Sequence, residues 1–213
     1  MSITRQDYLD FLIDVAFVGQ VTEAESSYGV AYQKAINTAY RDVQRTIVYK
    51  ELRPEEISDF KNKCRNQIAN SLQMLLSLAP LNEDVFDAWH QELCESLTQN
   101  GILSIGQAQK WVNMTLKNLC VLEALGVEGV SGFTEKTDLF HVPIDTYVME
   151  LVRKEQLGIL IEAEIKRSRG GASSAWSKWH DYASYLKVQK AFRSRLKGGQ
   201  SPFEWELKGW KRK

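Results

Sequence analysis

The chain has 213 residues, 44% of them apolar, and its 27 basic side chains balance its 27 acidic ones. This length suits one large domain or two small, closely packed ones, and the apolar content excludes a globally disordered chain. The longest apolar stretch, residues 74–81, is too short to cross a bilayer, and the N-terminal residues lack the pattern of a signal peptide. We therefore expect a cytoplasmic protein without a membrane partner.

The zero net charge hides an uneven distribution along the chain. Residues 1–150 hold 12 Lys and Arg against 21 Asp and Glu, a balance of −9, whereas residues 151–213 hold 15 against 6, a balance of +9. A basic segment of this kind is the usual electrostatic footprint of a nucleic-acid-binding protein. The alternative is that the two oppositely charged parts attract each other across the fold. Of the two, we favour a polyanionic partner.

Apolar residues recur with a helical period through the first hundred residues. Pro54 marks a helix start, because proline needs no amide partner in the first turn, and Pro80 stops the same helix. Asn82 is a suitable cap for the next one. These signals predict helices over residues 4–18, 23–49, 54–79 and 83–98.

The second half of the chain continues the helical pattern. Ser104 and Gln107 have the spacing of a capping box, glycines make residues 126–141 a loop, and residues 168–174 form a flexible break. We expect helices over residues 105–124, from Pro143 onward through Asp145, over 174–196, and in a short terminal segment that starts at Pro202. With no strand alternation, the predicted fold class is all-α.

Lys110 lies in the first turns of the helix predicted over residues 105–124. Most helical lysines are solvated surface residues. Here the positive end of the helix dipole and apolar neighbours such as Trp111 both disfavour a charged amine. A neutral amine is a nucleophile that forms a Schiff base with a sugar carbon. Lys110 is therefore a candidate catalytic residue.

Asp145 follows Pro143 by two residues and so lies at the start of its own predicted helix. The simpler interpretation is an acid that stabilises the helix start by up to about 1 kcal/mol. The chemical interpretation is a carboxylate that stabilises the oxocarbenium-like transition state of glycosidic cleavage. An amine and a carboxylate at two helix starts suit the opening of a bond at a sugar carbon.

These two segments resemble the reactive segments of the helix-hairpin-helix DNA glycosylases. The family hairpin reads approximately Leu-Pro-Gly-Val-Gly-Arg-Lys-Thr-Ala-Asn, and Gly106, Lys110 and Asn113 match its first glycine, its lysine and its asparagine. Residues 144–148 are similar to the family segment Val-Asp-Thr-His-Val, with Tyr147 in place of histidine.

The archaeal 8-oxoguanine glycosylase branch is the most similar. It has a Gln-Lys pair, as in Gln109-Lys110, and a terminal helix with proline eight residues before tryptophan, as in Pro202 and Trp210. The hairpin of this chain departs from the family pattern at positions 105, 107 and 108, where Ile, Gln and Ala stand. The glycine-rich turn is therefore altered, although amides at the helix start still suit a DNA phosphate.

The resemblance implies one glycosylase-like unit over residues 1–213, in which a helical half (1–100) and a hairpin and catalytic half (101–213) flank a cleft. It implies a monomer that binds duplex DNA, flips out a damaged or modified base and cleaves its N-glycosidic bond. Asp145 would stabilise the sugar, and Lys110 would attack C1′ or orient the reaction, with strand cleavage by β-elimination as a further activity. The branch points to oxidised guanine, a bulky modified pyrimidine is equally compatible, and the role is either repair or defence against foreign DNA.

A base extruded from the stack needs aromatic faces and a polar reader at its edge. By resemblance, Trp210 and Glu206 belong to this base pocket, and further candidates are Trp111, Trp89 and His141. We assign the aromatic stripe of residues 176, 179, 182 and 185 to the core. The expected DNA contacts are Gly106, Gln107, Gln109, Arg167, Arg169, Lys190, Arg193 and Lys197.

Cysteine and histidine usage argues against a bound metal or other cofactor. Cys64, Cys94 and Cys120 are odd in number and widely spaced, so we expect free buried thiols in a reducing compartment. They are too few for the four-cysteine iron–sulfur cluster of the glycosylase superfamily, and no His or Cys has zinc-site spacing. Phosphate-loop and dinucleotide motifs are also missing from the sequence.

Two other functions remain open. The first is a non-catalytic helical module that binds nucleic acid, and the altered hairpin favours it. The second is a helical interaction protein whose basic C-terminal part docks on an acidic partner. Base release from DNA separates the glycosylase from both, and a steep salt dependence of DNA binding counts against the second.

Overall fold

The computed structural model describes residues 16, 29–50, 52–168, 170, 175–196 and 199–210, the last of them without its side chain. The helix predicted over residues 4–18 and the first part of that over 23–49 lie outside these ranges, apart from residue 16. The elements in chain order are α2 (Val30–Val43), η2 (Gln44–Thr46), α3 (Pro54–Ser77), α4 (Glu83–Thr98), α5 (Ile105–Ala124), η3 (Thr134–Lys136), α6 (Thr146–Lys154), α7 (Ile161–Ser168), η4 (Trp176–Lys178), α8 (Tyr182–Arg195) and α9 (Pro202–Trp210), where η marks a short 3-10 helix. The described residues form helices and no strand, which confirms the predicted all-α class.

Several helix starts lie where local chemistry predicts them. α3 begins at Pro54. The side chain of Asn82 caps α4 by accepting a hydrogen bond from the amide of Val85. Ser104 and Gln107 form the expected capping box at the start of α5. α9 begins at Pro202.

Three predicted boundaries were wrong. The helix predicted to end at residue 49 ends at Val43 as α2, and only the 3-10 helix η2 follows, to Thr46. α6 begins at Thr146 rather than at Pro143, because Asp145 has an extended backbone and caps the helix instead of lying within it. The helix predicted over residues 174–196 is divided into η4 and α8, since the Asp181 side chain accepts two backbone hydrogen bonds and starts a new helix at Tyr182.

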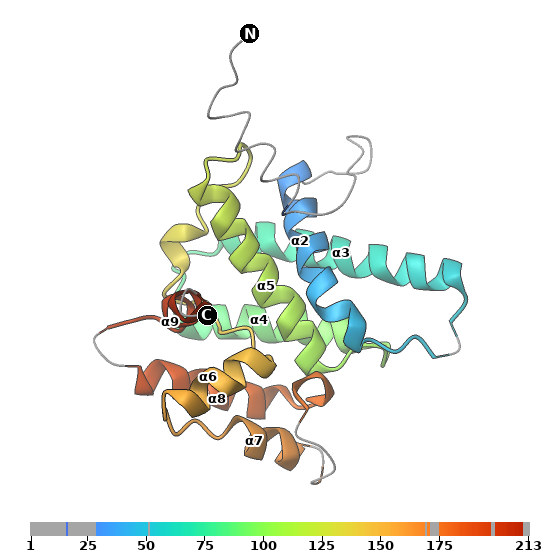
Figure 1. The fold of residues 1–213 in the computed structure, drawn as a ribbon. Helices are drawn as coiled ribbons and strands as arrows, with labels where there is room; N and C mark the ends of the chain where they lie inside the picture. Colours follow the sequence, from blue (N-terminus) through green and yellow to red (C-terminus); the bar gives the residue numbers. More distant parts are fainter. Residues whose placement is uncertain are drawn as a thin grey trace.

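α5 runs through the middle of the molecule, and α2 lies against it (Figure 1). α4 packs on α5, and α3 packs on both α2 and α4. α6, α7 and α8 gather near the N-terminal end of α5, where η4 also contacts it (Figure 1). The buried apolar side chains form one cluster that extends from Ala31 to Trp205. The start of α5 is therefore the place where the N-terminal and C-terminal helices meet.

Cys64, Cys94 and Cys120 are buried and not in disulfides, as expected for structural thiols. Among the described residues, none of the helices has the length and apolar character needed to cross a bilayer.

Candidate active site

The structure brings Lys110 and Asp145 together. The Lys110 Nζ donates a hydrogen bond to Oδ2 of Asp145, and the two side chains are 6% and 17% exposed. The other carboxylate oxygen, Oδ1, accepts from the amide of Val148 at 2.9 Å and thereby caps α6. Asp145 is thus both a helix cap and the partner of a nearly buried amine. An ion pair so far removed from water is screened much less than one on the surface.

The segment that carries Asp145 is tied to two helices by glutamine side chains. We call residues 141–145 the strap. Gln109 of α5 bonds both backbone groups of Ile144, at 2.8 and 3.1 Å. Gln189 of α8 does the same at Val142, accepting from its amide at 3.0 Å and donating to its carbonyl at 2.8 Å. All of these groups are buried, so the strap has little freedom to shift Asp145.

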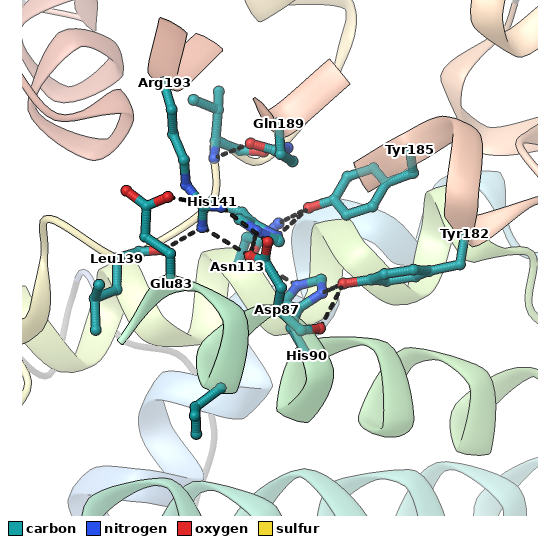
Figure 2. Close-up of polar contacts among 12 residues, drawn as sticks. Glu83, Asp87, His90, Asn113, Leu139, His141, Tyr182, Tyr185, Gln189 and Arg193 are labelled. Carbon is teal, nitrogen blue, oxygen red and sulfur yellow. Dashed lines mark hydrogen bonds and ion pairs between the residues drawn. The ribbon is translucent and has the colours of Figure 1, made fainter. Parts of the chain in front are cut away.

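His141, at the start of the strap, joins a buried polar network (Figure 2). Its Nε2 lies 2.8 Å from Oδ1 of Asp87, a carboxylate that also receives two hydrogen bonds from Arg193, at 2.7 and 2.9 Å. Burial lowers the pKa of His141 to about 4, although its bond to Asp87 acts in the opposite direction. Burial alone would raise the pKa of Asp87, but the hydrogen bonds from His141 and Arg193 hold it below its ordinary value. We therefore expect a neutral histidine that donates to a charged carboxylate.

The network continues into α5 through Asn113 (Figure 2). Its Nδ2 donates to the hydroxyl of Tyr185 at 2.9 Å, and that hydroxyl lies 3.1 Å from Nδ1 of His141. Its Oδ1 lies 3.0 Å from Nε2 of His90, whose Nδ1 lies 2.7 Å from the hydroxyl of Tyr182. Consistent donors and acceptors require both tyrosine hydroxyls to donate to the histidines. The network is buried, and we interpret it as the support of the strap.

A pocket of about 290 Å³ opens beside the Lys110–Asp145 pair. Its volume is close to the lower limit of about 300 Å³ for small-molecule sites. It is lined by Asp42, Arg45, Lys110, Met114, Asp145, Thr146, Tyr147 and Trp176. The lining combines two carboxylates, two cations, an indole and a phenol, which is suitable chemistry for a planar polar ligand.

The structure has a second, wider groove of about 700 Å³, and some of its lining residues directly follow pocket residues in the sequence. The pocket takes Arg45 and Trp176 from η2 and η4, and the groove takes the residues that follow them, Thr46 and Ser177. Among the described residues, its ionisable lining side chains are Lys50, Lys178 and His180, with no acid. An anionic chain suits such a groove.

The predicted base-pocket residues need correction. Trp111 and Trp89 are buried in the core, where their indole nitrogens donate to the carbonyls of Ile36 and Ser71 at 3.0 and 2.9 Å. His141 belongs to the strap network and does not line the pocket.

Glu206, predicted to read the base, is also buried. Both of its oxygens accept from Lys117, at 2.7 and 2.9 Å, in an ion pair between α9 and α5. The side chain of Trp210 lies outside the described residues.

Four predicted DNA contacts are also corrected. The amide of Gly106 donates to the carbonyl of Trp179 at 3.0 Å, and a side chain at this position would lie 1.8 Å from the carbonyl oxygen of Trp176. Glycine is therefore needed here for the close approach of η4. The remaining three, Gln107, Gln109 and Arg193, use their polar groups within the protein. Gln107 nevertheless lines the wider groove.

The other predicted contacts divide into two groups. The side chain of Arg167 is 63% exposed, although it pairs with Glu164, and Lys190 is exposed on α8. Both remain accessible to an anionic partner. Arg169 and Lys197 lie outside the described residues.

Among the pocket residues that sequence reasoning missed are Asp42, Arg45 and Trp176. Asp42 and Arg45 fall in the helix predicted over residues 23–49, whose pattern showed only a buried face, and no motif distinguishes them. Trp176 was assigned to a core stripe on one long helix. Asp181 was the available signal, since a cap at that position separates Trp176 from α8 and leaves its ring half-buried at the pocket.

A comparison with protein families, with curated proteins and with solved structures finds none that matches this chain. Among the residues that the structure describes, no group of three or more His, Cys, Asp or Glu side chains is arranged to hold a metal ion.

Proposed function

We propose that this protein is a DNA glycosylase that takes a modified or damaged base out of the DNA stack and cleaves its N-glycosidic bond. One observation carries the proposal: Lys110 and Asp145, far apart in the sequence, form a nearly buried pair on the wall of a small polar pocket. The pair supplies a carboxylate and an amine, which are the two groups needed to cleave a bond at a sugar carbon and to capture the product.

In the proposed reaction, the C1′–N bond breaks and its electron pair leaves with the base. The carboxylate of Asp145 faces the positive charge that develops on the sugar. Lys110, after losing its proton to solvent, bonds to C1′ through the nitrogen lone pair. A proton then moves from this nitrogen to O4′ as the C1′–O4′ bond breaks, which opens the sugar ring and leaves a Schiff base at C1′. Water hydrolyses the Schiff base and frees the lysine, either directly or after β-elimination has expelled the 3′ phosphate. The buried surroundings strengthen each of these electrostatic interactions.

Several features support DNA as the substrate. Trp176 and Tyr147 offer aromatic surfaces in the pocket, as an extruded base requires. The adjoining groove is lined by Lys50 and Lys178, and further basic side chains are exposed on α7 and α8. The similarity of residues 106–113 and 144–148 to reactive segments of the helix-hairpin-helix glycosylases agrees with this assignment.

The first experiment is incubation of the protein with genomic DNAs that carry different base modifications and lesions, followed by mass spectrometry of the released bases. Lys110→Ala and Asp145→Asn are the test variants, and Lys136→Ala, outside the pocket, is the control. We expect release by the wild type and the control only. Borohydride should trap a protein–DNA adduct that Lys110→Ala does not form. Full activity of Asp145→Asn would overturn the site assignment.

The second candidate is a non-catalytic module that binds nucleic acid. It is favoured by the internal hydrogen bond of the Gly106 amide to Trp179, which removes a donor from the position where a DNA phosphate was expected. Under this alternative the wild type binds DNA with a steep salt dependence but releases no base.

A further inference from the structure

The pocket contains a second carboxylate that the reaction described above does not use. Asp42 lies near the end of α2 and lines the pocket together with Lys110 and Asp145. Its side chain is exposed, so a ligand in the pocket has access to it. Within the described part of the chain, no hydrogen bond or ion pair of the Asp42 side chain is found. Asp42 therefore differs from Asp145, whose oxygens both accept hydrogen bonds from the protein.

The surroundings of Asp42 favour its protonated form. The protein around the pocket wall removes part of its hydration and raises its pKa, and the negative charge of Asp145 acts in the same direction. Positive charges act in the opposite direction without cancelling the effect. They come from Lys110, Arg41 and Lys117. Arg45 and the phenol of Tyr147 line the same pocket.

In glycosidic cleavage, two carboxyl groups with different surroundings divide two tasks. One protonates the leaving group, and the other stabilises the positive charge on the sugar. Both oxygens of Asp145 already accept hydrogen bonds, from Val148 and Lys110. We therefore assign to Asp145 the task of facing the positive charge that develops on the sugar. A departing base needs a proton on a ring nitrogen or carbonyl oxygen, because a base anion is a poor leaving group. The remaining carboxyl of the pocket is that of Asp42.

We propose that Asp42 is the general acid that protonates the departing base, an inference that rests on the proposed glycosylase function. As the C1′–N bond breaks, its electron pair goes to the base, and the carboxyl proton of Asp42 goes to the same base. Asp42 is left as a carboxylate and regains its proton from solvent after the base has left. This role makes the enzyme suited to bases that leave poorly without protonation.

The test compares wild type, Asp42→Asn and the exposed control Glu128→Gln on two duplexes under single-turnover conditions. One duplex carries 8-oxoguanine. The other carries N7-methylguanine, a cationic base that leaves without a proton. Loss of a general acid slows cleavage by roughly 10²–10⁴-fold. We expect this loss for Asp42→Asn on 8-oxoguanine and an effect within about threefold on N7-methylguanine, with Glu128→Gln equal to wild type on both.

If the genomic screen identifies a different base, the pH profile of its release gives the same information. The wild-type rate should fall as pH rises above the pKa of Asp42, because only the protonated carboxyl gives a proton. Asp42→Asn should lack this falling limb. A merely structural role of Asp42 would slow release at all pH values and from both duplexes alike.

The possible failures are distinguishable. An unchanged rate, or an equal loss on both duplexes with an unchanged pH profile, overturns the role of Asp42 while Lys110→Ala and Asp145→Asn still abolish release. If wild type releases no base from any DNA, both this inference and the proposed function fall.

Discussion

Gln109 holds Ile144 by both backbone groups: its Oε1 accepts from the Ile144 amide at 3.1 Å and its Nε2 donates to the Ile144 carbonyl at 2.8 Å. The residues that follow these two in the chain are Lys110 and Asp145, the ion pair at the pocket. One side chain therefore fixes the position of α5 against the strap immediately before both reactive groups. This contact accounts for the close approach of two residues that are distant in the sequence.

The two hydrogen bonds from the Gln109 side chain to the Ile144 backbone, here called the clamp, give a stability prediction. Gln109→Ala leaves the buried amide and carbonyl of Ile144 without partners, and each unpaired buried group costs about 1–3 kcal/mol. We expect the free energy of unfolding to fall by at least about 2 kcal/mol, measured by urea unfolding. Gln91→Ala removes a surface glutamine that bonds only Glu95 among the described contacts, and it should leave the unfolding midpoint almost unchanged. Equal midpoints for the two variants would contradict the clamp.

The two roles of Asp145 can be separated by substitution. Asp145→Ser keeps a side chain that caps α6 but removes the carboxylate beside Lys110. We expect base release to be lost and the unfolding free energy to fall by about 3–5 kcal/mol, because the nearly buried Lys110 amine is left without its partner. Asp181→Ser makes the same change at the cap of α8 and should retain release. Release by Asp145→Ser at the wild-type rate would reduce Asp145 to a helix cap.

Because His141 and His90 are buried, we expect the free energy of unfolding to fall in mild acid. The pKa of His141 falls from 6.5 in the unfolded chain to about 4 in the fold through burial. Between these values the unfolded chain binds more protons than the folded one, so the unfolding free energy decreases as pH falls, by about 3 kcal/mol for this residue. His90, whose pKa burial also lowers, acts in the same direction.

Asp87 adds to this effect. Although burial alone would raise its pKa, the hydrogen bonds from His141 and Arg193 lower it in the fold. The contribution of Asp87 to the unfolding free energy is therefore present above the pKa of the unfolded chain and is lost as pH falls further. Urea midpoints between about pH 7 and pH 5 measure the slope. His141→Gln should flatten it, whereas the exposed-site variant His180→Gln should not. Identical slopes in all three proteins would contradict a neutral, buried His141.

The sequence predicted the all-α class and several helix starts because those depend on local chemistry. Pro54, Asn82 and Ser104 act within a few residues of their own positions. The approach of Lys110 to Asp145 depends on the contact of Gln109 with Ile144, which no periodicity reveals. By contrast, the burial of Glu206 depends on Lys117, a partner on another helix that no local pattern reveals.

The same reason explains the errors over DNA contacts. A basic residue in a positively charged segment is equally consistent with a phosphate partner and with a buried carboxylate from elsewhere in the fold. For Arg193 that carboxylate is Asp87, which lies on α4. Trp176 was missed because a cap at Asp181 changes the backbone path, which places the indole at the pocket rather than in the stripe.

Two basic residues of α8, Arg193 and Lys190, can be tested as a pair. Arg193 has a 9% exposed side chain that forks onto Asp87, whereas Lys190 is exposed. Arg193→Lys keeps the positive charge and loses the planar fork, so we expect a fall of about 1–3 kcal/mol in unfolding free energy with DNA affinity retained. Lys190→Ala should keep stability within about 0.5 kcal/mol but weaken DNA binding. It should also reduce the slope of log affinity against log salt by about 0.9, because one phosphate contact is lost.

Urea unfolding and fluorescence anisotropy with a labelled duplex at several salt concentrations measure the two quantities on the same samples. An unchanged unfolding midpoint for Arg193→Lys would argue against the fork to Asp87. An unchanged salt slope for Lys190→Ala would remove this surface of α8 from the DNA interface. The pair thus separates charge that holds the fold together from charge that attracts a polyanion, a distinction that the +9 balance of residues 151–213 does not make.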